Sequence, residues 1–349
     1  MKKVNILGVY FEITSKCNAF CKYCYNDSSS QKIKNISFEK IEEIFYNLKK
    51  SNIKEVTISG GEPLLHSDFL KILECANKYD FNIILFTNGM LLNDFIIRKI
   101  IECNAKVQIT LNGSNAKIHE KINNNKGSFK KIINALEIFD LYEYLDNVYF
   151  KTILQSDNFC DTENIILLAK KNNIKTVSFT FLTYSGREKF KINGSEYGDR
   201  IIYSERMKQL TKKYPDIKID YSSVVSICKF CKDIDILKVY PKVDSSGNVF
   251  LCTLFENELS IGSCYEDKIM NILSVDKINR FCNNLKVSYN NFEKCKSCIY
   301  RERCKGGCCG IAHIKYNRLF DDGFCEIRIA NFLEELKAKR VIMENQKYV

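Results

Sequence analysis

The sequence contains no apolar run close to the roughly 18 residues that a membrane-spanning helix needs. Residues 1–6 lead directly into strand-like sequence, without the apolar core of a signal peptide. Histidine is scarce, and His66, His119 and His313 do not stand at metal-ligand spacing from one another. These absences predict a soluble, cytoplasmic protein with no membrane partner, in which each histidine is structural.

The charge is unbalanced but not concentrated. Lysine and arginine exceed aspartate and glutamate by a formal +11, yet the basic residues are spread along the chain among acidic residues and asparagines. Such mixing indicates general surface solvation rather than a basic stripe, so we predict no nucleic-acid partner. With 349 residues and 45% apolar content, the chain can form one large core and a smaller second unit.

Cysteine is the residue in excess. Seventeen cysteines are more than a cytoplasmic chain of this size needs for packing, and a large cytosolic chain is a poor disulfide scaffold. Metal or cluster ligation explains them better. Cys17, Cys21 and Cys24 stand close together, and a second dense group runs over residues 228–325. The sequence therefore predicts two separate metal regions.

The first half of the chain alternates strand-like and helix-like stretches. The predicted strands are 9–14, 55–59, 82–87, 106–111, 147–154 and 176–183. A sample helix covers 38–50, where Ser37 is a plausible N-cap and apolar residues recur at helical spacing. Alternating strands and helices imply a parallel sheet, so we predict an α/β fold with a partial (β/α)6 TIM-like barrel.

Unusual residues follow the predicted strands. They are Cys17, the Gly-Gly-Glu-Pro segment 60–63, the Thr-Asn-Gly segment 87–89, the Thr-Leu-Asn-Gly segment 110–113 and the Ser-Gly-Arg segment 185–187. The carboxyl ends of parallel barrel strands share one mouth, where active sites of such barrels lie. We therefore expect these segments to converge.

The domain boundary falls where the alternation ends. We predict a barrel over residues 1–190, a bridging segment over 191–227 with a short helix near 205–213, and a small cysteine-rich α+β domain over 228–349. Within this domain we expect one hairpin over 240–251 that turns at 245–248, and a closing helix over 326–343.

The first cysteine group has the spacing of an iron–sulfur site. Cys17, Cys21 and Cys24 supply three thiolates on one loop, which leaves one iron of a four-iron cluster open for catalysis. A zinc knuckle is the alternative, but its usual cysteine pairs and histidine ligands are not here.

The Cys-x3-Cys-x2-Cys spacing, with Tyr23 before the last cysteine, resembles the motif of the radical S-adenosylmethionine (radical SAM) superfamily. Segments 60–63, 87–89 and 110–113 match later signatures of that family in order and placement. The resemblance implies S-adenosylmethionine as cofactor, chelated by the open iron. It implies cofactor-binding positions at Tyr23, Gly60, Gly61, Glu62, Pro63, Thr87, Asn88 and Thr110.

One of these segments departs from the family. The commoner pattern has Ser-x-Asp-Gly at residues 110–113. Thr110 can still donate a hydroxyl hydrogen bond to a carboxylate, whereas Asn112 lacks the charge and receives no role. Arg187 follows Gly186 as in many relatives, and both a site role and a structural ion pair stay open for it.

The C-terminal cysteines resemble those of the SPASM domain, the auxiliary-cluster extension of radical SAM enzymes. By that resemblance Cys295, Cys298, Cys304 and Cys325 hold one auxiliary 4Fe-4S cluster, and Cys231, Cys252 and Cys308 belong to the other. Cys228 is our choice for the fourth ligand of the latter cluster, with Cys309 or an open iron as alternatives. The enzyme would thus carry three 4Fe-4S clusters. Cys75, Cys103, Cys160, Cys264 and Cys282 are isolated and predicted to pack as small hydrophobic residues.

The resemblance implies that the reduced first cluster cleaves S-adenosylmethionine to methionine and a 5′-deoxyadenosyl radical, which abstracts a substrate hydrogen. An auxiliary cluster can accept the remaining electron, so net oxidation is expected. The commonest substrates of SPASM relatives are ribosomally made peptides, which gain thioether or carbon–carbon crosslinks or are epimerised. We predict such a peptide substrate and a flavodoxin-like or ferredoxin-like reductant.

Two departures qualify this prediction. Cys17 leaves no room for an N-terminal leader-peptide recognition domain, so we expect a separate recognition protein or direct docking. Sulfatase-maturing relatives have an acidic residue after the cysteine equivalent to Cys252, where this chain has Thr253. A sulfatase maturase, an enzyme acting on a small molecule or haem precursor, and a non-enzymatic iron–sulfur or zinc protein remain the alternatives. The sequence identifies no catalytic acid or base.

Overall fold

The computed structural model describes residues 3–182, 186–188, 196–221, 236–255, 259–304, 306–318 and 325. Its strands are β1 (Lys3–Ile6), β2 (Val9–Thr14), β3 (Glu55–Gly60), β4 (Asn82–Thr87), β5 (Lys106–Thr110), β6 (Val148–Leu154), β7 (Thr176–Phe181), β8 (Lys218–Tyr221), β9 (Ile236–Val239), β10 (Lys242–Val243), β11 (Asn248–Phe250) and β12 (Gly262–Ser263). Its α-helices are α1 (Phe38–Lys50), α2 (Phe69–Lys78), α3 (Asp94–Glu102), α4 (Ala116–Asn123), α5 (Ser128–Leu141), α6 (Ser156–Phe159), α7 (Thr162–Lys171), α8 (Glu196–Lys213), α9 (Ile269–Ile272), α10 (Val275–Asn291), α11 (Glu293–Lys296), α12 (Arg301–Cys304) and α13 (Cys309–Tyr316).

Ten strands form one sheet in the order β12-β11-β10-β2-β3-β4-β5-β6-β7-β8. Pairing is parallel from β10 to β8, and only β11 and β12 run antiparallel to their neighbours. The α/β fold with a mostly parallel sheet is therefore confirmed. Strands β2 to β7 match the six predicted ones closely, whereas β8 extends the sheet within the segment that we expected to bridge the domains.

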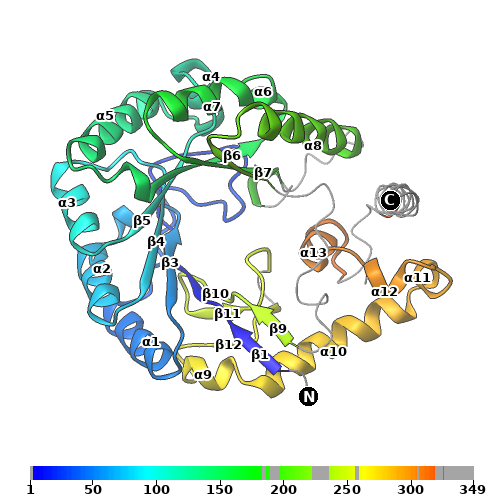
Figure 1. Cartoon of the computed structure of the whole chain (residues 1–349). Coiled ribbons are helices and arrows are strands. Elements are labelled where there is room, and N and C mark those ends of the chain that lie inside the picture. Colours follow the sequence, from blue (N-terminus) through cyan, green and yellow to red (C-terminus); the bar gives the residue numbers. More distant parts are fainter. Residues whose placement is uncertain are drawn as a thin grey trace, which may run out of the picture.

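The helices surround the sheet on its convex side. Figure 1 shows α1, α2, α3, α5 and α7 as an arc outside the strands, with the C-terminal helices α10 to α13 on the open side. Helix α1 begins as predicted, because the Ser37 side chain accepts a hydrogen bond from the backbone N–H of Lys40. Its apolar stripe is buried, and Phe45 meets Phe11 of β2 edge to face, with 5.4 Å between ring centroids.

The two faces of the sheet carry different residues, because side chains alternate along each strand. Outward residues such as Phe11 of β2, Ile58 of β3 and Phe150 of β6 form the core beneath the helices. Strand register brings polar residues together on the opposite, concave side, which we call the inner face. They include Tyr10, Glu12, Ser59, Gln108, Thr110, Lys151, Ser178, Asp220 and Lys242.

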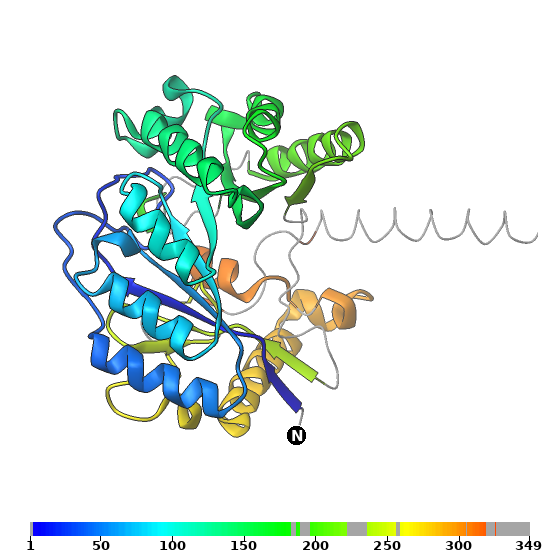
Figure 2. The same ribbon diagram turned by 60° about the vertical axis from the view of Figure 1, so that its left-hand side comes forward.

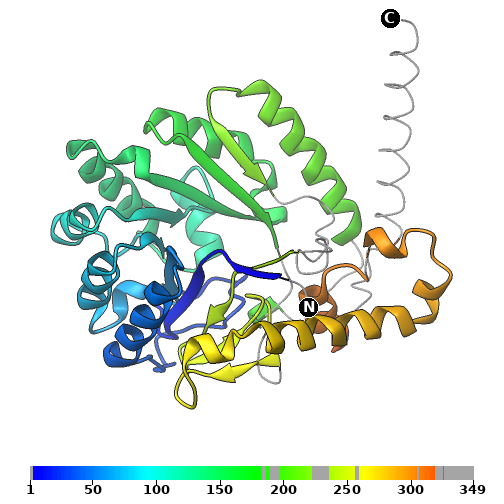
Figure 3. The same ribbon diagram turned by 60° about the horizontal axis from the view of Figure 1, so that its bottom comes forward.

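The C-terminal segment joins the barrel through strands. β10 pairs in parallel with β2, so that Lys242 lies opposite Tyr10. β1 and β9 form a separate parallel pair, seen side by side in Figure 2, and α10 passes beside β1 (Figure 3). The predicted hairpin is present as β10 and β11. Its turn is fixed by the Asp244 carboxylate, which accepts the backbone N–H groups of Ser246 and Asn248 at 2.8 and 2.9 Å.

Two predicted helices of the second half of the chain have different outcomes. The helix expected near 205–213 is longer and covers Glu196–Lys213. The closing helix expected over 326–343 lies outside the described residues. Within the part of the chain that the structure describes, no helix is long and apolar enough to cross a membrane.

Candidate functional site

The loop that follows β2 carries the first three cysteines and is held from several directions. The backbone N–H of Cys17 donates to the Ser29 carbonyl at 3.1 Å. The N–H groups of Phe20 and Lys22 donate to carbonyls at the C-terminal end of α4, each at 3.3 Å. These bonds join backbone atoms alone and fix both ends of the loop segment from residue 17 to residue 22.

The three cysteine side chains lie in a partly apolar setting. Cys17 is buried beside Ala19 and Met90, with Cys21 packed against this group. Burial raises the pKa of the Cys17 and Cys21 thiols to about 12. Thiolates at this position therefore need a compensating positive charge, which iron would supply.

Two backbone donors already point at the sulfurs. The N–H of Ala19 donates to Cys17 Sγ at 3.4 Å, and the N–H of Ser28 donates to Cys24 Sγ at 3.3 Å. Ser28 Oγ itself is buried without a hydrogen-bond partner. Donors aimed at sulfur and an unsatisfied hydroxyl beside Cys24 fit an iron–sulfur cluster held by this loop.

The Gly-Gly-Glu-Pro segment at the end of β3 packs directly against the cysteine loop. Gly60 has a φ of 143°, and a Cβ there would overlap the Thr14 carbonyl. The N–H groups of Gly61 and Glu62 donate to the Thr14 and Lys16 carbonyls at 2.7 and 2.9 Å. Only glycine allows this approach of two backbones.

Glu62 is fully buried at the same strand end. Its carboxylate accepts the Thr87 hydroxyl and the Asn88 backbone N–H, both at 2.8 Å, and the Leu64 N–H at 3.2 Å. Burial raises the pKa of Glu62 to about 7. Among the described residues, no Lys, Arg or His forms an ion pair with it. A buried carboxylate without an internal cation is suited to a cationic ligand such as an ammonium group.

The Thr-Asn-Gly segment after β4 connects this carboxylate to the cysteines. Thr87 and Asn88 bond Glu62, as described above, and the Asn88 side chain donates to Asn18 Oδ1 at 2.8 Å. The same amide lies 4.0 Å from Cys17 Sγ. The structure thus brings the predicted positions 60–63 and 87–88 to the edge of the first cysteine loop.

The segment that follows β5 is held by several buried hydrogen bonds. Thr110 ends β5 opposite Lys151 of β6. Asn112, which we assigned no role, is fully buried and donates to Tyr23 Oη at 2.7 Å and to Asn123 Oδ1 at 2.9 Å. Its carbonyl and side-chain oxygen accept bonds from Asn158 and Ile153.

Tyr23 therefore points its hydroxyl inward, toward Asn112 and Cys21. His119 belongs to the same network. Its Nδ1 accepts the Asn112 N–H at 3.1 Å, and burial lowers its pKa to about 4, so the ring stays neutral. This agrees with a structural histidine. Its ring, like Asn112, holds the segment that supports the cysteine loop.

Arg187 holds the other side of the loop. Its guanidinium donates to the Cys21 and Ser28 carbonyls and to Asp27 Oδ1, the last at 3.0 Å, and stacks on the Phe20 ring at 3.7 Å. The backbone N–H of Arg187 also donates to the Cys24 carbonyl. We considered a structural ion pair and a role at the site for Arg187. It forms an ion pair with Asp27, and its other contacts place it beside the cysteine loop.

The C-terminal cysteines are only partly described. Cys228 and Cys231 lie outside the described residues. Cys252 and Cys308 are close enough that each thiolate would disfavour the other, and burial, the larger cause, raises the pKa of Cys252 to about 12. The proximity of these two cysteines agrees with their placement in one auxiliary site.

The remaining cysteines of this segment include two on four-residue helices. Cys295 and Cys304 belong to α11 and α12, and the N–H of Cys298 bonds the Cys295 carbonyl at 3.2 Å. Cys325 is partly exposed. Cys309, the alternative fourth ligand, is 3% exposed and packs in the main core. Among the described residues, no three His, Cys, Asp or Glu side chains are spaced to hold a single metal ion.

The isolated cysteines divide into two kinds. Cys75, Cys103, Cys264 and Cys282 are buried in the main core, as predicted. Cys160 is exposed, so the prediction that it packs as a hydrophobic residue is wrong. It follows the last residue of α6 and stands between the partly buried Phe159 and the buried Asp161.

Two family models match separate parts of the chain. The model described as the radical SAM superfamily matches residues 11–169, and the SPASM model, an iron–sulfur cluster-binding domain, matches residues 236–299.

Among curated relatives, the chain is 27% identical over 178 residues to the mycofactocin maturase MftC of Mycolicibacterium smegmatis. The aligned part covers 51% of this chain and 45% of that relative, so the chain spans about half the length of that relative. It is 22% identical to the subtilosin biosynthesis protein AlbA of Bacillus subtilis, covering 89% and 69% of the two chains. It is 24% identical to a cysteine-type anaerobic sulfatase-maturating enzyme of Clostridium novyi, covering 90% of each.

Solved structures show the same fold. The chain superposes on anSMEcpe with bound AdoMet and Cp18Cys peptide at a TM-score of 0.70 and 19% identity, covering 98% and 99% of the two chains. Streptococcus suis SuiB bound to its precursor peptide SuiA gives a TM-score of 0.71 at 15% identity, covering 91% and 75%.

Proposed function

Because the chain belongs to the radical SAM superfamily and carries a C-terminal SPASM domain, we propose that it cleaves S-adenosylmethionine reductively and uses the resulting 5′-deoxyadenosyl radical on a ribosomally made peptide. The observation that carries the proposal is the meeting of the three-cysteine loop with Glu62 at one barrel mouth. A loop whose three cysteines would leave one iron open, and a buried carboxylate with no ion pair among the described residues, suit the amino-acid end of this cofactor.

The residues of the mouth would divide the work as follows. Cys17, Cys21 and Cys24 would hold a 4Fe-4S cluster, which supplies the electron that cleaves the cofactor. Glu62 would bind the ammonium of the cofactor, and Thr110 would donate to its carboxylate. Tyr23 and Asn88 would support the loop and the strand end from the contacts described above. The enclosing barrel would keep water from the radical.

The SPASM domain would complete the oxidation. We propose that Cys252 and Cys308, with Cys228 and Cys231, hold one auxiliary 4Fe-4S cluster, and that Cys295, Cys298, Cys304 and Cys325 hold the other. In a crosslinking reaction the peptide loses two hydrogens. One hydrogen atom would be transferred to the 5′-deoxyadenosyl radical, which gives 5′-deoxyadenosine. The other would leave as a proton, and its electron would pass to an auxiliary cluster. Epimerisation would need no such acceptor.

Peptide modification is supported by the relatives as a group. AlbA is named for bacteriocin biosynthesis, MftC is named a maturase, and SuiB was solved with a precursor peptide. The likeness to AlbA extends over 89% of this chain. A separate leader-recognition protein and a flavodoxin-like or ferredoxin-like reductant belong to the same proposal.

Sulfatase maturation is the second candidate, because the Clostridium novyi relative aligns over 90% of each chain. Thr253 argues against it. The residue after Cys252 carries no carboxylate, and its backbone carbonyl is bound by Lys242 at 3.1 Å. A small-molecule substrate has no comparable observation in its favour.

The first experiment measures 5′-deoxyadenosine after anaerobic reconstitution and reduction with S-adenosylmethionine. Wild type is compared with a variant carrying Cys17→Ala, Cys21→Ala and Cys24→Ala. The matched control carries Cys75→Ala, Cys103→Ala and Cys264→Ala, which removes three buried core cysteines instead. We expect the nucleoside from wild type and control only. Its absence from fully iron-loaded wild type would refute the radical proposal.

The substrate class is tested next by mass spectrometry. The enzyme is incubated in parallel with two deuterated peptides. One is a precursor peptide of the subtilosin type, and the other is a sulfatase peptide with its target cysteine. Loss of two hydrogens from the first peptide, with deuterium in 5′-deoxyadenosine, supports crosslinking. Conversion of the sulfatase peptide alone would favour the second candidate.

A further inference from the structure

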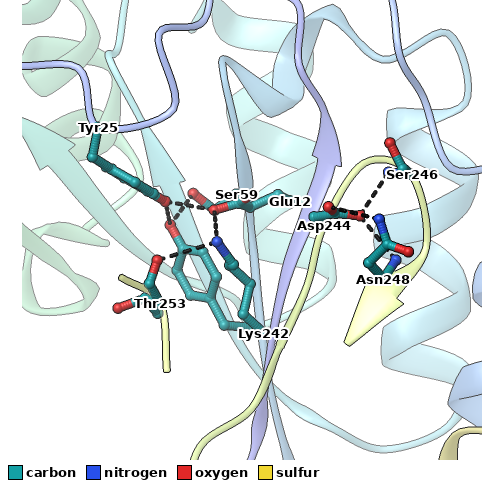
Figure 4. A network of polar contacts seen from close by, with 9 residues as sticks. Glu12, Tyr25, Ser59, Lys242, Asp244, Ser246, Asn248 and Thr253 are labelled. Atoms are coloured by element: carbon teal, nitrogen blue, oxygen red, sulfur yellow. Dashed lines mark hydrogen bonds and ion pairs between the residues drawn. The ribbon is translucent and has the colours of Figure 1, made fainter. Parts of the chain in front are cut away.

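A buried lysine reaches from the C-terminal segment into the barrel. Lys242 stands in β10, and its side chain is 5% exposed. Its ammonium donates to the carbonyl oxygen of Thr253 at 3.1 Å and lies 3.8 Å from Glu12 Oε1 (Figure 4). Thr253 follows Cys252, so Lys242 forms a hydrogen bond with the backbone directly beside a proposed cluster ligand.

The partner carboxylate leads to the first cysteine loop. Glu12 stands on the inner face of β2 and is 4% exposed. It accepts the hydroxyl of Tyr25 at 2.7 Å, and Tyr25 follows Cys24. The Tyr25 hydroxyl lies 3.2 Å from that of Tyr10, which lies 2.6 Å from Ser59 Oγ. One continuous chain of polar contacts thus runs from Tyr25, the neighbour of Cys24, to Thr253, the neighbour of Cys252 (Figure 4).

The position of Lys242 is set by backbone pairing. β10 is parallel to β2 with Lys242 opposite Tyr10, and the Asp244 turn closes the hairpin immediately after it. The stem of the side chain lies against the Phe250 ring, with the ammonium 4.9 Å from its centroid. A buried ammonium is costly unless it is paired and hydrogen-bonded. Lys242 is both, through one carbonyl and one carboxylate.

We propose that Lys242 is a positioning residue for the auxiliary cluster site, which fixes the Cys252 loop through the Thr253 carbonyl and ties it through Glu12 and Tyr25 to the loop that carries Cys24. The inference rests on the proposed function, because it assumes a cluster at Cys252. It adds that the geometry of this auxiliary site depends on an ion pair inside the barrel.

The Cys252 loop has apolar anchors, since Phe255 is buried with its ring 5.5 Å from that of Phe281. Lys242 supplies a polar contact directly beside Cys252. The N–H of Phe255 bonds the Cys252 carbonyl at 3.1 Å, which is a contact within the loop itself. Lys242 provides a contact to a different strand. Partners of this kind orient the groups that bind a metal, and their removal typically lowers metal affinity about 10- to 100-fold.

The test isolates the auxiliary iron. Variants are made in a background carrying Cys17→Ala, Cys21→Ala and Cys24→Ala, so that bound iron reports the C-terminal sites alone. Lys242→Met, Lys242→Arg and Glu12→Gln are compared. Lys151→Met is the matched control, because Lys151 is also a strand lysine of the inner face but bonds Ser178, at 3.0 Å. Far-UV circular dichroism and cooperative unfolding check that each variant is folded.

The readouts are iron and sulfide per chain, the rate of iron loss to a chelator, and the electron paramagnetic resonance spectrum of the reduced protein. We expect Lys242→Met to lose iron about 10- to 100-fold faster and to change the spectrum. Lys242→Arg should restore retention, Glu12→Gln should have a smaller effect, and Lys151→Met should match the background.

Unchanged retention and spectrum in folded Lys242→Met would overturn the inference while leaving the proposed function intact. An equal loss in Lys151→Met would also overturn it, because any buried lysine would then matter as much. If the background protein binds no iron at all, the auxiliary clusters themselves are refuted, and the inference is refuted with them.

Discussion

The two cysteine regions are held in different ways. The loop of Cys17, Cys21 and Cys24 is fixed by groups from distant strands and helices, among them the α4 carbonyls, Gly60 and Arg187. Cys295 and Cys304 lie on the four-residue helices α11 and α12, and Cys298 lies between them. The N–H groups of Cys295, Cys298 and Cys304 bond carbonyls three or four residues earlier in the chain. Distant parts of the barrel therefore hold the first region, whereas the backbone hydrogen bonds described for these three cysteines join neighbouring residues.

A second contrast concerns carboxylates. Glu62, beside the first region, is buried and has no ion pair with any residue that the structure describes, while Glu12, on the path to the second, is paired with Lys242. We propose a ligand for the first carboxylate, whereas the second already has a partner within the protein. Variants that remove single contacts test both contrasts.

The largest expected effect comes from Gly60→Ala. A methyl group would overlap the Thr14 carbonyl at a φ of 143°, so strain and overpacking together should cost about 3 kcal/mol or more. Gly127→Ala is the matched control, since Gly127 also has a positive φ, of 79°, but nothing lies within 4 Å of its Cβ position. Its cost should be about 1 kcal/mol.

Urea unfolding and first-site iron content measure the Gly60 effect. We expect Gly60→Ala to lose iron at Cys17, Cys21 and Cys24 while auxiliary iron stays bound. Equal loss from both regions would show that the first loop is not held separately.

Arg187→Gln should have the next largest effect. It removes charge-assisted hydrogen bonds to the Cys21 and Ser28 carbonyls and to Asp27, worth about 2 kcal/mol in this partly buried position. Arg206→Gln, which breaks an ion pair with Glu163 at the surface of α7 and α8, should cost less than about 1 kcal/mol. Hydrogen exchange of residues 20–28 should rise in the first variant alone. No rise there would show that Arg187 is dispensable for the loop.

Binding of S-adenosylmethionine should weaken in acid because of Glu62. Its pKa of about 7 means that the carboxyl is protonated below pH 7 and ionised above it. A cationic ligand binds the ionised form, so affinity should fall by up to about tenfold for each pH unit below 7. Calorimetric titration between pH 5.5 and 7.5 measures this, with Glu62→Gln expected to bind weakly and without that slope. A flat wild-type profile would exclude Glu62 from cofactor binding.

The smallest effects are expected at two cysteines assigned to no cluster. Cys309→Ala removes a core sulfur and should cost about 1 kcal/mol without loss of iron. Cys160→Ala, at an exposed position, should change neither the free energy of unfolding nor the iron content. Iron loss in Cys309→Ala would instead make it the fourth ligand that we assign to Cys228.

Local patterns predicted most of the barrel. Strands β2 to β7 were found from β-branched and aromatic runs, and α1 from Ser37 and its apolar spacing. The strand-end segments were expected to converge, and those at Glu62 and Asn88 meet the cysteine loop. These features depend on neighbours in sequence or on the regular geometry of parallel strands.

Long-range partners were missed, because no local pattern encodes them. The parallel pairing of β1 with β9 and of β10 with β2, and the added strand β8, were not predicted. Neither were the Arg187 contacts nor the pair of Glu12 with Lys242. Glu12 did leave a signal, since a charged residue between Phe11 and Ile13 in a buried strand requires a partner.

The pairing of β10 with β2 also bears on the order of folding. A ribosome makes Tyr10 long before Lys242, so one edge of β2 stays without its final neighbour until about two thirds of the chain has been synthesised. Contacts between such distant residues slow folding, because a long loop must close before the strands can pair. The first cysteine loop follows the end of β2. This loop therefore stands beside the edge of the sheet that is the last to be completed.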